Sequence, residues 1–398
     1  MKNVKVVIGA NFGDEGKGLM TDYFAAQSAG PCLVVLHNGG AQRGHTVVTP
    51  GGFRHVFHHF GCGTFAGADT YCAEEFVVNP VLFREEYEKL AKHGRHIHNF
   101  YINPKCKLTT IYDMLINQAI ELDRGTAKHG SCGIGVFETL YRNQKGIDFV
   151  AKFTKYADAM TVGEFAGMSI FEKIHFLSYL RDEYVPRRFN ELGLHKMSQL
   201  FEDVLKSDNA LMNYIDDFQF MIEHSACANE ALFDSYDTVI FEGAQGLLLD
   251  QHNMDYFPHL TPSNTGMLNP ATILANYGWM GDVEVCYVSR TYMTRHGAGR
   301  FDTECDKALI NKNMIDMTNV PNPFQDVLRY GTLDTAELYT RCFDDAISVA
   351  NIGHFRIQAG IALTHINEYD CGCILRETYF SNGMTRDDVH IRKDYIRK

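Results

Sequence analysis

The sequence lacks an apolar run long enough to cross a membrane. A lysine near its start precedes only a few apolar residues, which are too few for a secretory signal. Basic residues are also in the minority, since 37 lysines and arginines face 49 aspartates and glutamates and the net charge is -12. This balance argues against a nucleic-acid-binding surface, so we expect neither a membrane nor a nucleic acid as partner.

The eleven cysteines lack the spacing of metal ligands, and the one close pair, Cys371 and Cys373, is separated by a single residue. Without a secretory signal, we expect reduced thiols and a cytoplasmic location. Repeats and low-complexity linkers are absent as well. The 398 residues, 45% of them hydrophobic, can bury a large core, and we expect one domain over 1–398 with a mainly helical insertion at about 162–229.

A glycine-rich loop follows the first apolar run, Val4–Ile8, which predicts a buried parallel strand. The loop contains three glycines and one lysine: Gly13, Gly16, Lys17 and Gly18. Strand, loop and helix in this order place backbone N–H groups and a positive helix end around a phosphate, with the lysine as counter-charge. Gly18 stands where the standard phosphate loop has a hydroxyl for magnesium, so we expect Asp14 to replace that ligand. A plain polar turn is the alternative, and the segments that follow favour phosphate binding.

A second polar loop, 37–46, follows the apolar run Cys32–Leu36 and contains three glycines and two histidines. Ligands bind at the carboxyl edge of a parallel sheet, and a histidine there can act as a general acid near neutral pH. His45 is therefore a candidate, with a plain loop residue as the alternative. A third loop, 130–135, contains Ser131 and is compatible with a phosphate cradle or with a simple connection.

Later apolar runs end in the same way. The runs are Thr238–Phe241, Val283–Val288 and Ile361–Thr364, and polar or glycine-rich loops follow each of them. Helical periodicity marks Leu82–His93 and Leu108–Leu122. The pattern predicts an α/β fold with a doubly wound, mainly parallel sheet, an N-terminal motif like a phosphate loop, and helical insertions.

At this point the chain resembles the adenylosuccinate synthetase family. Seven collinear segments carry the resemblance: Gly13-Asp14-Glu15-Gly16-Lys17-Gly18, Gly44-His45-Thr46-Val47, 241–250, 263–265, 294–304, 331–335 and 381–386. The resemblance implies a ligase that uses Mg²⁺, a nucleoside triphosphate, a purine nucleoside monophosphate and L-aspartate, and that forms a homodimer. Phosphorylation of the purine O6 would create a good leaving group, which the amino group of aspartate then displaces.

The resemblance also implies residue roles. Asp14 would take the N1 proton, His45 would help to move the γ-phosphate onto O6, and Lys17 would stabilise the transferring phosphoryl group. Magnesium would bind at Asp14 and Gly44. The triphosphate would contact Gly13, Glu15, Gly16, Lys17, Gly18, Gly44, Thr46, Asn367, Ser381 and Gly383. The substrate nucleotide would contact Asp14, Gln42, Arg43, Ser131, Gln245 and Thr261, with Arg142 a candidate to reach it across the dimer interface. Aspartate would contact Thr303, Gln325 and Arg329.

Departures from the family concern specificity. Where the family reads guanine with Lys-Leu-Asp, this chain has His365-Ile366-Asn367. An Asn amide offers one acceptor and one donor, which suits the adenine N6 amine and N1. Mispairing a buried polar edge costs about 1–3 kcal/mol, or roughly tenfold or more in preference. We therefore expect ATP or dATP rather than GTP as donor.

Further departures resemble a bacteriophage branch of the family that joins aspartate to dGMP on the route to diaminopurine DNA. The family's arginine-rich loop keeps one arginine here, Arg329, which is compatible with a deoxynucleotide, and Gln42-Arg43 replaces Asn-Ala beside the base. A phage enzyme would act in the host cytoplasm. Asp14 is kept, although many enzymes of that branch have a small residue there. Adenylosuccinate synthesis from IMP with GTP therefore stays open, as does a nucleotide-binding regulator without ligase activity.

Overall fold

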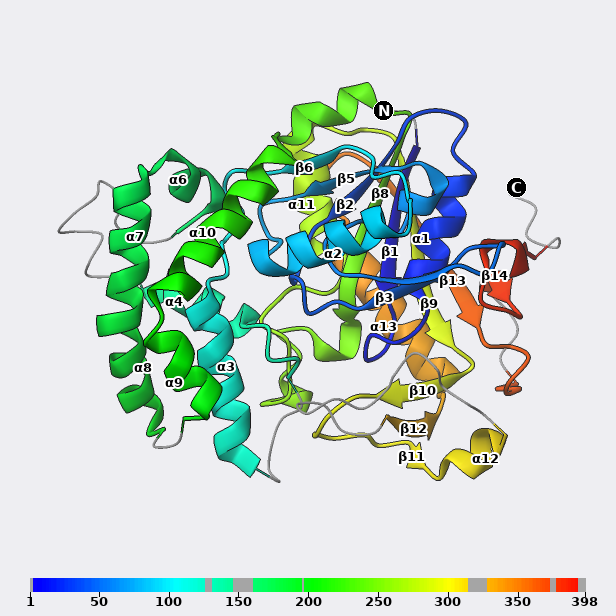
Figure 1. The fold of residues 1–398 in the computed structure, drawn as a ribbon. Helices are drawn as coiled ribbons and strands as arrows, with labels where there is room; N and C mark the ends of the chain where they lie inside the picture. Colours follow the sequence, from blue (N-terminus) through cyan, green and yellow to red (C-terminus); the bar gives the residue numbers. More distant parts are fainter. Residues whose placement is uncertain are drawn as a thin grey trace.

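A ten-stranded sheet forms the centre of the computed structural model, which describes residues 3–125, 131–145, 160–194, 197–313, 328–372 and 377–392 (Figure 1). Its strand order is β15-β14-β13-β9-β1-β8-β2-β5-β6-β7. The strands are β1 (Asn3–Gly9), β2 (Cys32–Leu36), β5 (Asp69–Cys72), β6 (Phe100–Ile102), β7 (Ala226–Cys227), β8 (Thr238–Gly246), β9 (Asp282–Arg290), β13 (Arg356–Thr364), β14 (Glu377–Ser381) and β15 (Val389–Ile391). Only the β14–β15 pair within this sheet is antiparallel, so the predicted α/β fold with a mainly parallel sheet is confirmed.

Hydrophobic residues cover both faces of this sheet. In β1, Val4, Val6 and Ile8 join one buried cluster, and Val7 joins the other. Burial on both faces explains why the central strands read as continuous apolar runs. The helices that flank the sheet are α1 (Lys17–Ala26), α2 (Pro80–Lys92), α11 (Leu268–Tyr277) and α13 (Thr335–Ser348).

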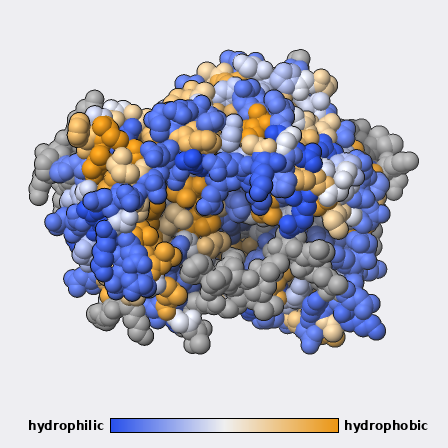
Figure 2. Space-filling model, viewed as in Figure 1, coloured by the Kyte–Doolittle hydropathy of each residue, from blue (hydrophilic) through white to orange (hydrophobic). Residues whose placement is uncertain are grey.

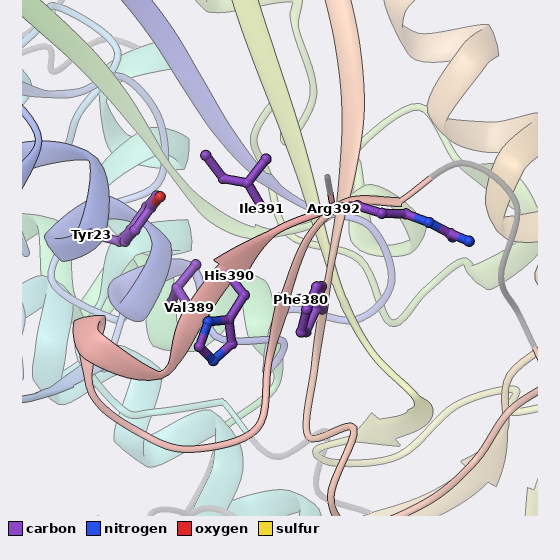
Figure 3. Close-up of a pocket in the computed structure, with 6 residues that line it drawn as sticks. All are labelled: Tyr23, Phe380, Val389, His390, Ile391 and Arg392. Atoms are coloured by element: carbon purple, nitrogen blue, oxygen red, sulfur yellow. The ribbon is translucent and has the colours of Figure 1, made fainter. Parts of the chain in front are cut away.

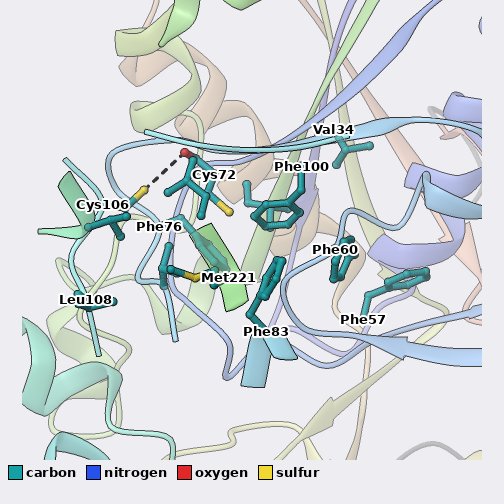
Figure 4. Packing of buried hydrophobic residues seen from close by; sticks show 14 of the residues in the cluster. Val34, Phe57, Phe60, Cys72, Phe76, Phe83, Phe100, Cys106, Leu108 and Met221 are labelled. Atoms are coloured by element: carbon teal, nitrogen blue, oxygen red, sulfur yellow. Dashed lines mark hydrogen bonds between the residues drawn. The ribbon is translucent and has the colours of Figure 1, made fainter. Parts of the chain in front are cut away.

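Aromatic side chains fill the core beneath α2. Phe83 of α2 packs between Phe60 and Phe100, with ring centroids 5.4 Å and 5.0 Å away (Figure 4). The Cys106 thiol donates to the carbonyl of Cys72 at 3.5 Å, and both thiols are buried. These cysteines therefore act as small core residues.

Two helices begin where capping residues allow. The Asn79 side chain accepts from the Leu82 amide and starts α2. Thr110 and Asp113 form a capping box, so α3 (Ile111–Arg124) begins three residues later than its periodicity predicts.

A group of helices lies to one side of the sheet, at the left of Figure 1. These are α3, α4 (Val136–Lys145), α6 (Val162–Gly167), α7 (Ile170–Tyr179), α8 (Val185–Leu192), α9 (Gln199–Leu205) and α10 (Asp208–Glu223). The division into one domain with an insertion at about 162–229 stays a prediction. The surface in this view is mainly hydrophilic, with hydrophobic patches over these helices (Figure 2). None of the helices in the described ranges has the length and hydropathy needed to span a membrane.

Two small sheets complete the fold. The β3 (His45–Val48) and β4 (Arg54–Phe57) strands form a hairpin, and Val48 pairs with Thr385 of the C-terminal loop. The second sheet has the order β10 (Tyr292–Arg295), β12 (Arg329–Thr332) and β11 (Glu304–Cys305), and the short helix α12 (Lys307–Asn311) packs on it (Figure 1).

Candidate active site

The loops that follow β2 and β8 meet at the carboxyl edge of the sheet. The Asn38 side-chain amide donates to the carbonyls of Ala244 and Asn264 at 3.0 and 2.9 Å, and its oxygen accepts from the Ala244 amide at 2.7 Å. The Gly39 amide donates to the Ser263 hydroxyl at 3.1 Å. These bonds join three of the polar segments that the sequence singles out, 37–46, 241–250 and 263–265. Thr261 lies beside the last of them, and its carbonyl accepts from the Ser263 amide at 2.8 Å.

The glycine loop after β1 is organised by its own charged residues. The Glu15 carboxylate accepts from the amides of Asn11 and Gly13 at 3.0 and 2.7 Å. The Lys17 ammonium donates to the Gly13 carbonyl at 2.6 Å and lies 3.4 Å from Glu15. Burial raises the pKa of Glu15, although Lys17 opposes that shift. The Glu15 side chain therefore shapes the loop from inside, and only its backbone is left for a triphosphate.

The Gln245 backbone packs against this loop in a left-handed conformation, with φ of 63°. Gly13 has φ of 114°, and a Cβ added there would lie 3.1 Å from the Gln245 Cα. A positive φ outside glycine costs energy and clusters at functional sites. The end of β8 therefore packs directly against the glycine loop.

His45 begins β3 and is held by Glu242 in the middle of β8. The His45 Nδ1 lies 2.6 Å from the Glu242 Oε1, and the Cys62 amide donates to the other carboxylate oxygen at 2.9 Å. Burial opposes ionisation of Glu242, but Arg43 and these donors outweigh it and lower its pKa to about 2. Burial also lowers the pKa of His45 to about 4. The ionised carboxylate fixes the proton on Nδ1, which leaves Nε2 for a ligand.

This histidine lies beside the start of α1. A Cβ added at Gly18 would lie 2.7 Å from the Thr46 carbonyl and 3.4 Å from the His45 Cβ. Glycine at position 18 thus lets β3 approach the helix that begins with Lys17. The Thr46 hydroxyl accepts from Arg54 at 3.4 Å, and Gly44 is exposed.

Asp14 is more accessible, with 26% of its side chain exposed. Its Oδ2 lies 3.5 Å from the His296 Nε2, and its carbonyl accepts from the Arg290 Nε at 2.5 Å. Neither of these two partners was predicted. His296 lies in a segment that carries the family resemblance, which was the only available signal for it.

Oxygen donors for a divalent cation are present at the two predicted positions. A carboxylate at Asp14 and a backbone carbonyl at Gly44 are the ligands that Mg²⁺ prefers. The donor set therefore fits magnesium. His45, Cys62 and Glu242 also place N, S and O donors within 4.8 Å of one another. The Arg43 guanidinium, 3.4 Å from Glu242, already supplies positive charge at that second position, so we interpret it as an ion-paired network.

The residues predicted to read the donor base come together at the ends of β13 and β14. The Ile366 amide donates to the Ser381 carbonyl at 3.3 Å, and the Ser381 hydroxyl donates to the Gly383 carbonyl at 2.8 Å. His365 turns the chain with φ of 62°, and Asn367 is exposed.

Two predicted substrate contacts are buried arginines paired with carboxylates. The Arg142 guanidinium is fully buried and makes two 2.9 Å bonds to Asp113 and one 2.8 Å bond to the Leu108 carbonyl. The Arg43 side chain is 1% exposed, and its Nη2 lies 3.4 Å from the Glu242 Oε1. Each arginine thus neutralises a buried carboxylate, and the substrate contacts of both stay predictions.

The remaining predicted contacts occupy two regions. The Ser131 hydroxyl accepts from Asn117 at 2.9 Å, and the Cys132 thiol lies 3.8 Å from the Gln42 carbonyl, which joins these two loops. Arg329 lies in β12 and donates to Glu304 at 2.8 Å and to the Gly299 carbonyl at 2.9 Å. Thr303 directly precedes β11, and its hydroxyl lies 3.7 Å from the Met293 Sδ. Gln325 lies outside the described residues. The roles of these residues stay predictions.

A cavity of about 600 Å³ lies elsewhere, between α1 and the C-terminal strands (Figure 3). It is lined by Tyr23, Phe380, Val389, His390, Ile391 and Arg392. None of the predicted site residues lines it, and its walls are mainly apolar. The cavity therefore offers no support for phosphate chemistry.

Comparison with known proteins gives consistent matches. The family model described as adenylosuccinate synthetase matches residues 6–324. The adenylosuccinate synthetase of Synechococcus sp. (strain WH7803) is 30% identical over 326 residues, which are 79% of this chain and 67% of that protein. The Mycobacterium leprae enzyme of the same name is 29% identical over 301 residues, which are 75% of this chain and 64% of that protein.

Two solved structures share the fold. The fully ligated adenylosuccinate synthetase of Plasmodium falciparum has a TM-score of 0.65 at 16% identity, covering 98% of this chain and all of that one (100%). The succinoaminodeoxyadenylate synthetase (PurZ) of cyanophage S-2L, bound to dGMP and dATP, has a TM-score of 0.59 at 16% identity, covering 98% of this chain and 95% of that one. At this identity the likeness concerns the fold alone.

Proposed function

This chain belongs to the adenylosuccinate synthetase family, and we propose that it joins L-aspartate to C6 of dGMP with ATP or dATP as phosphoryl donor. The product would be 2-amino-2′-deoxyadenylosuccinate. Membership of the family makes the protein a C–N ligase that binds nucleotide substrates, aspartate and a nucleotide energy donor. The choice of nucleotides is the part that is proposed.

Asn367 is the observation that carries the proposal. It follows the left-handed turn at His365 and is exposed beside the Ser381–Gly383 loop. A carboxylate at this position would accept from the two donors of guanine, whereas an amide pairs one donor and one acceptor with adenine. The PurZ structure carries dATP and dGMP, which is the same nucleotide combination.

The reaction uses the loops at the carboxyl edge of the sheet. Asp14 takes the N1 proton of the purine, O6 attacks the γ-phosphorus, and the bond to the departing diphosphate breaks. The Lys17 ammonium and the Nε2 of His45 stabilise the transferring phosphoryl group. The aspartate amine then attacks C6, the C6–O6 bond breaks, and phosphate leaves with O6 and with the proton that the amine gives up. Magnesium, when bound by Asp14 and Gly44, neutralises charge on the phosphates.

Conventional synthesis of adenylosuccinate from IMP with GTP is the second candidate. Two observations favour it: Asp14 is retained, and the curated relatives at 30% and 29% identity are named adenylosuccinate synthetases. A regulator without ligase activity is not retained, because the family is one of ligases. A homodimer stays part of the proposal, and Arg142 stays the candidate to reach the substrate across its interface.

A substrate matrix tests the proposal. The protein is incubated with aspartate, magnesium and each combination of dGMP or IMP with ATP or GTP, and the succinyl product is quantified. We expect dGMP with ATP to give the highest kcat/KM. A clear preference for IMP with GTP would contradict the proposal and establish the second candidate.

The Asn367→Asp variant tests the reading of the donor base. The variant should shift the ratio of kcat/KM for ATP and GTP by roughly tenfold or more toward GTP. Asn351→Asp, an exposed asparagine in the turn before β13, is the matched control and should leave the ratio unchanged. If the ATP-to-GTP ratio of kcat/KM is the same in Asn367→Asp as in Asn351→Asp, position 367 does not face the base.

A further inference from the structure

One oxygen of Glu242 is shared by two side chains. The Glu242 Oε1 lies 2.6 Å from the His45 Nδ1 and 3.4 Å from the Arg43 Nη2. The same guanidinium nitrogen donates to the Phe60 carbonyl at 2.8 Å and lies 4.0 Å from the Cys62 Sγ. Arg43 therefore connects the loop before β3 to the segment after β4 and to β8.

These groups are withdrawn from solvent. The side-chain exposures are 1% for Arg43, 0% for Glu242 and 8% for His45. Arg43 is thus almost as deeply buried as the carboxylate that it faces. A buried carboxylate with a neutral imidazole as its only side-chain partner would be costly, and a guanidinium supplies the missing charge.

We propose that Arg43 is a positioning residue for the ligase reaction, acting on His45 through Glu242. By keeping Glu242 ionised and in place, Arg43 makes the carboxylate accept from the His45 Nδ1. The imidazole is then fixed in one orientation and one tautomer, with Nε2 directed away from the carboxylate. The inference rests on the proposed function, because it concerns the histidine that faces the phosphoryl group.

The surroundings of His45 contain few other charges among the described residues. Lys17, Arg43 and Glu242 all act electrostatically on its ring. The Cys62 amide donates to Glu242, and Asp22 acts on the Cys62 thiol. His37 also interacts electrostatically with Glu242. Within the described ranges, the Arg43 guanidinium brings a full positive charge within 3.4 Å of this carboxylate.

Kinetics of Arg43→Met and Arg43→Lys test the proposal, with the best nucleotide pair of the wild type. We expect kcat to fall about 10- to 100-fold in Arg43→Met and less in Arg43→Lys. The KM values for the nucleotides and aspartate should stay within roughly threefold, because a residue that acts through His45 does not itself bind the substrates. Arg188→Lys is the matched control. Arg188 is 7% exposed and makes bonds of 2.8 and 3.0 Å to the buried Glu138, far along the chain in α8.

A spectroscopic measurement separates this inference from the proposed function. In ¹⁵N-histidine-labelled protein, the two-bond and three-bond couplings of each ring report its tautomer, and loss of a signal in His45→Gln assigns that ring. We expect an Nδ1–H tautomer for His45 in the wild type and in Arg188→Lys, and a change of tautomer population in Arg43→Met. This result does not depend on which nucleotides the enzyme accepts, or on turnover.

Three results would overturn the inference. The first is a folded Arg43→Met with kcat within twofold of wild type and an unchanged His45 tautomer. The second is a loss of kcat no larger than that in Arg188→Lys, which would indicate general loss of stability. The third is a rise in KM with kcat unchanged, which would place Arg43 on a substrate. If Arg43→Met does not fold, Arg43→Lys decides by the same criteria, with its tautomer expected to match the wild type and its kcat to be reduced.

Discussion

Two buried carboxylates, Glu242 and Asp22, each face an arginine, yet their acidities move in opposite directions. The pKa of Glu242 falls to about 2, although burial opposes that change. Burial raises the pKa of Asp22 to about 7, although Arg386 lies 2.9 Å away. Both side chains have 0% exposure, so the depth of burial does not explain the difference.

The number of donors explains it. Glu242 receives the His45 ring, the Cys62 amide and the Arg43 charge. Asp22 has one ion-pair contact, and in the described part of the chain neither of its oxygens accepts a well-aligned hydrogen bond. Asp387 adds a repulsive charge. A buried carboxylate stays ionised where several donors converge on it. In this fold the donors converge on Glu242, beside the proposed catalytic residue His45.

The largest effect is expected for Glu242→Gln. This variant leaves the buried Arg43 charge without a counter-ion, which should lower the free energy of unfolding by about 3–5 kcal/mol. It also releases the His45 ring, and kcat should fall about 10²- to 10⁴-fold. Urea unfolding and the succinyl-product assay measure the two effects. If Glu242→Gln loses less unfolding free energy and less kcat than Asp22→Asn does, the proposed difference between the two carboxylates is wrong.

The pH dependence of stability provides the second comparison. Because the pKa of Asp22 is raised from 3.8 to about 7, the folded state binds its proton more tightly than the unfolded chain. Its contribution is therefore fully present below about pH 4 and is lost as the pH rises through about 7, at up to about 1.4 kcal/mol per pH unit. Glu242 has the opposite sign, since its lowered pKa gives a contribution that is lost as the pH falls from 4.5 toward about 2.

Unfolding free energies of wild type and Asp22→Asn across this range measure the Asp22 component. The variant should lack the decline that the wild type shows between about pH 4 and about pH 7. Parallel curves for the two proteins would mean that Asp22 is ionised throughout, like Glu242.

The smallest effect is expected for Asp22→Asn at about pH 4. The folded state holds Asp22 protonated there, which a neutral asparagine mimics, and Arg386 keeps a contact to the Phe65 carbonyl at 3.4 Å. The free energy of unfolding should change by no more than about 1 kcal/mol. A thermal melt beside that of Glu242→Gln would show the contrast, and equal losses in the two variants would remove it.

Local sequence signals predicted the elements well. The strand β2 has the bounds that its apolar run predicts, Cys32–Leu36, and the glycine loop follows β1 as expected. The start of α3 differed because Thr110 and Asp113 form a cap that periodicity does not reveal. Patterns within ten or so residues therefore locate the strand ends where the site is built.

Long-range charge pairing was not predictable in the same way. Glu242 lies 197 residues from His45, and only the family resemblance marks its segment. Arg142 and Asp113 are 29 residues apart, and no local pattern marks either as buried. The sequence alone therefore did not predict the carboxylate partners of Arg43 and Arg142.

Transfer of the purine oxygen tests the central claim most directly. The protein is incubated with aspartate, ATP, magnesium and dGMP that carries ¹⁸O at position 6, and the released phosphate is analysed by mass spectrometry. The account predicts that ¹⁸O appears in inorganic phosphate in equal amount to the succinyl nucleotide formed from dGMP. Phosphate without ¹⁸O, or product formed only when IMP and GTP replace dGMP and ATP, would contradict it.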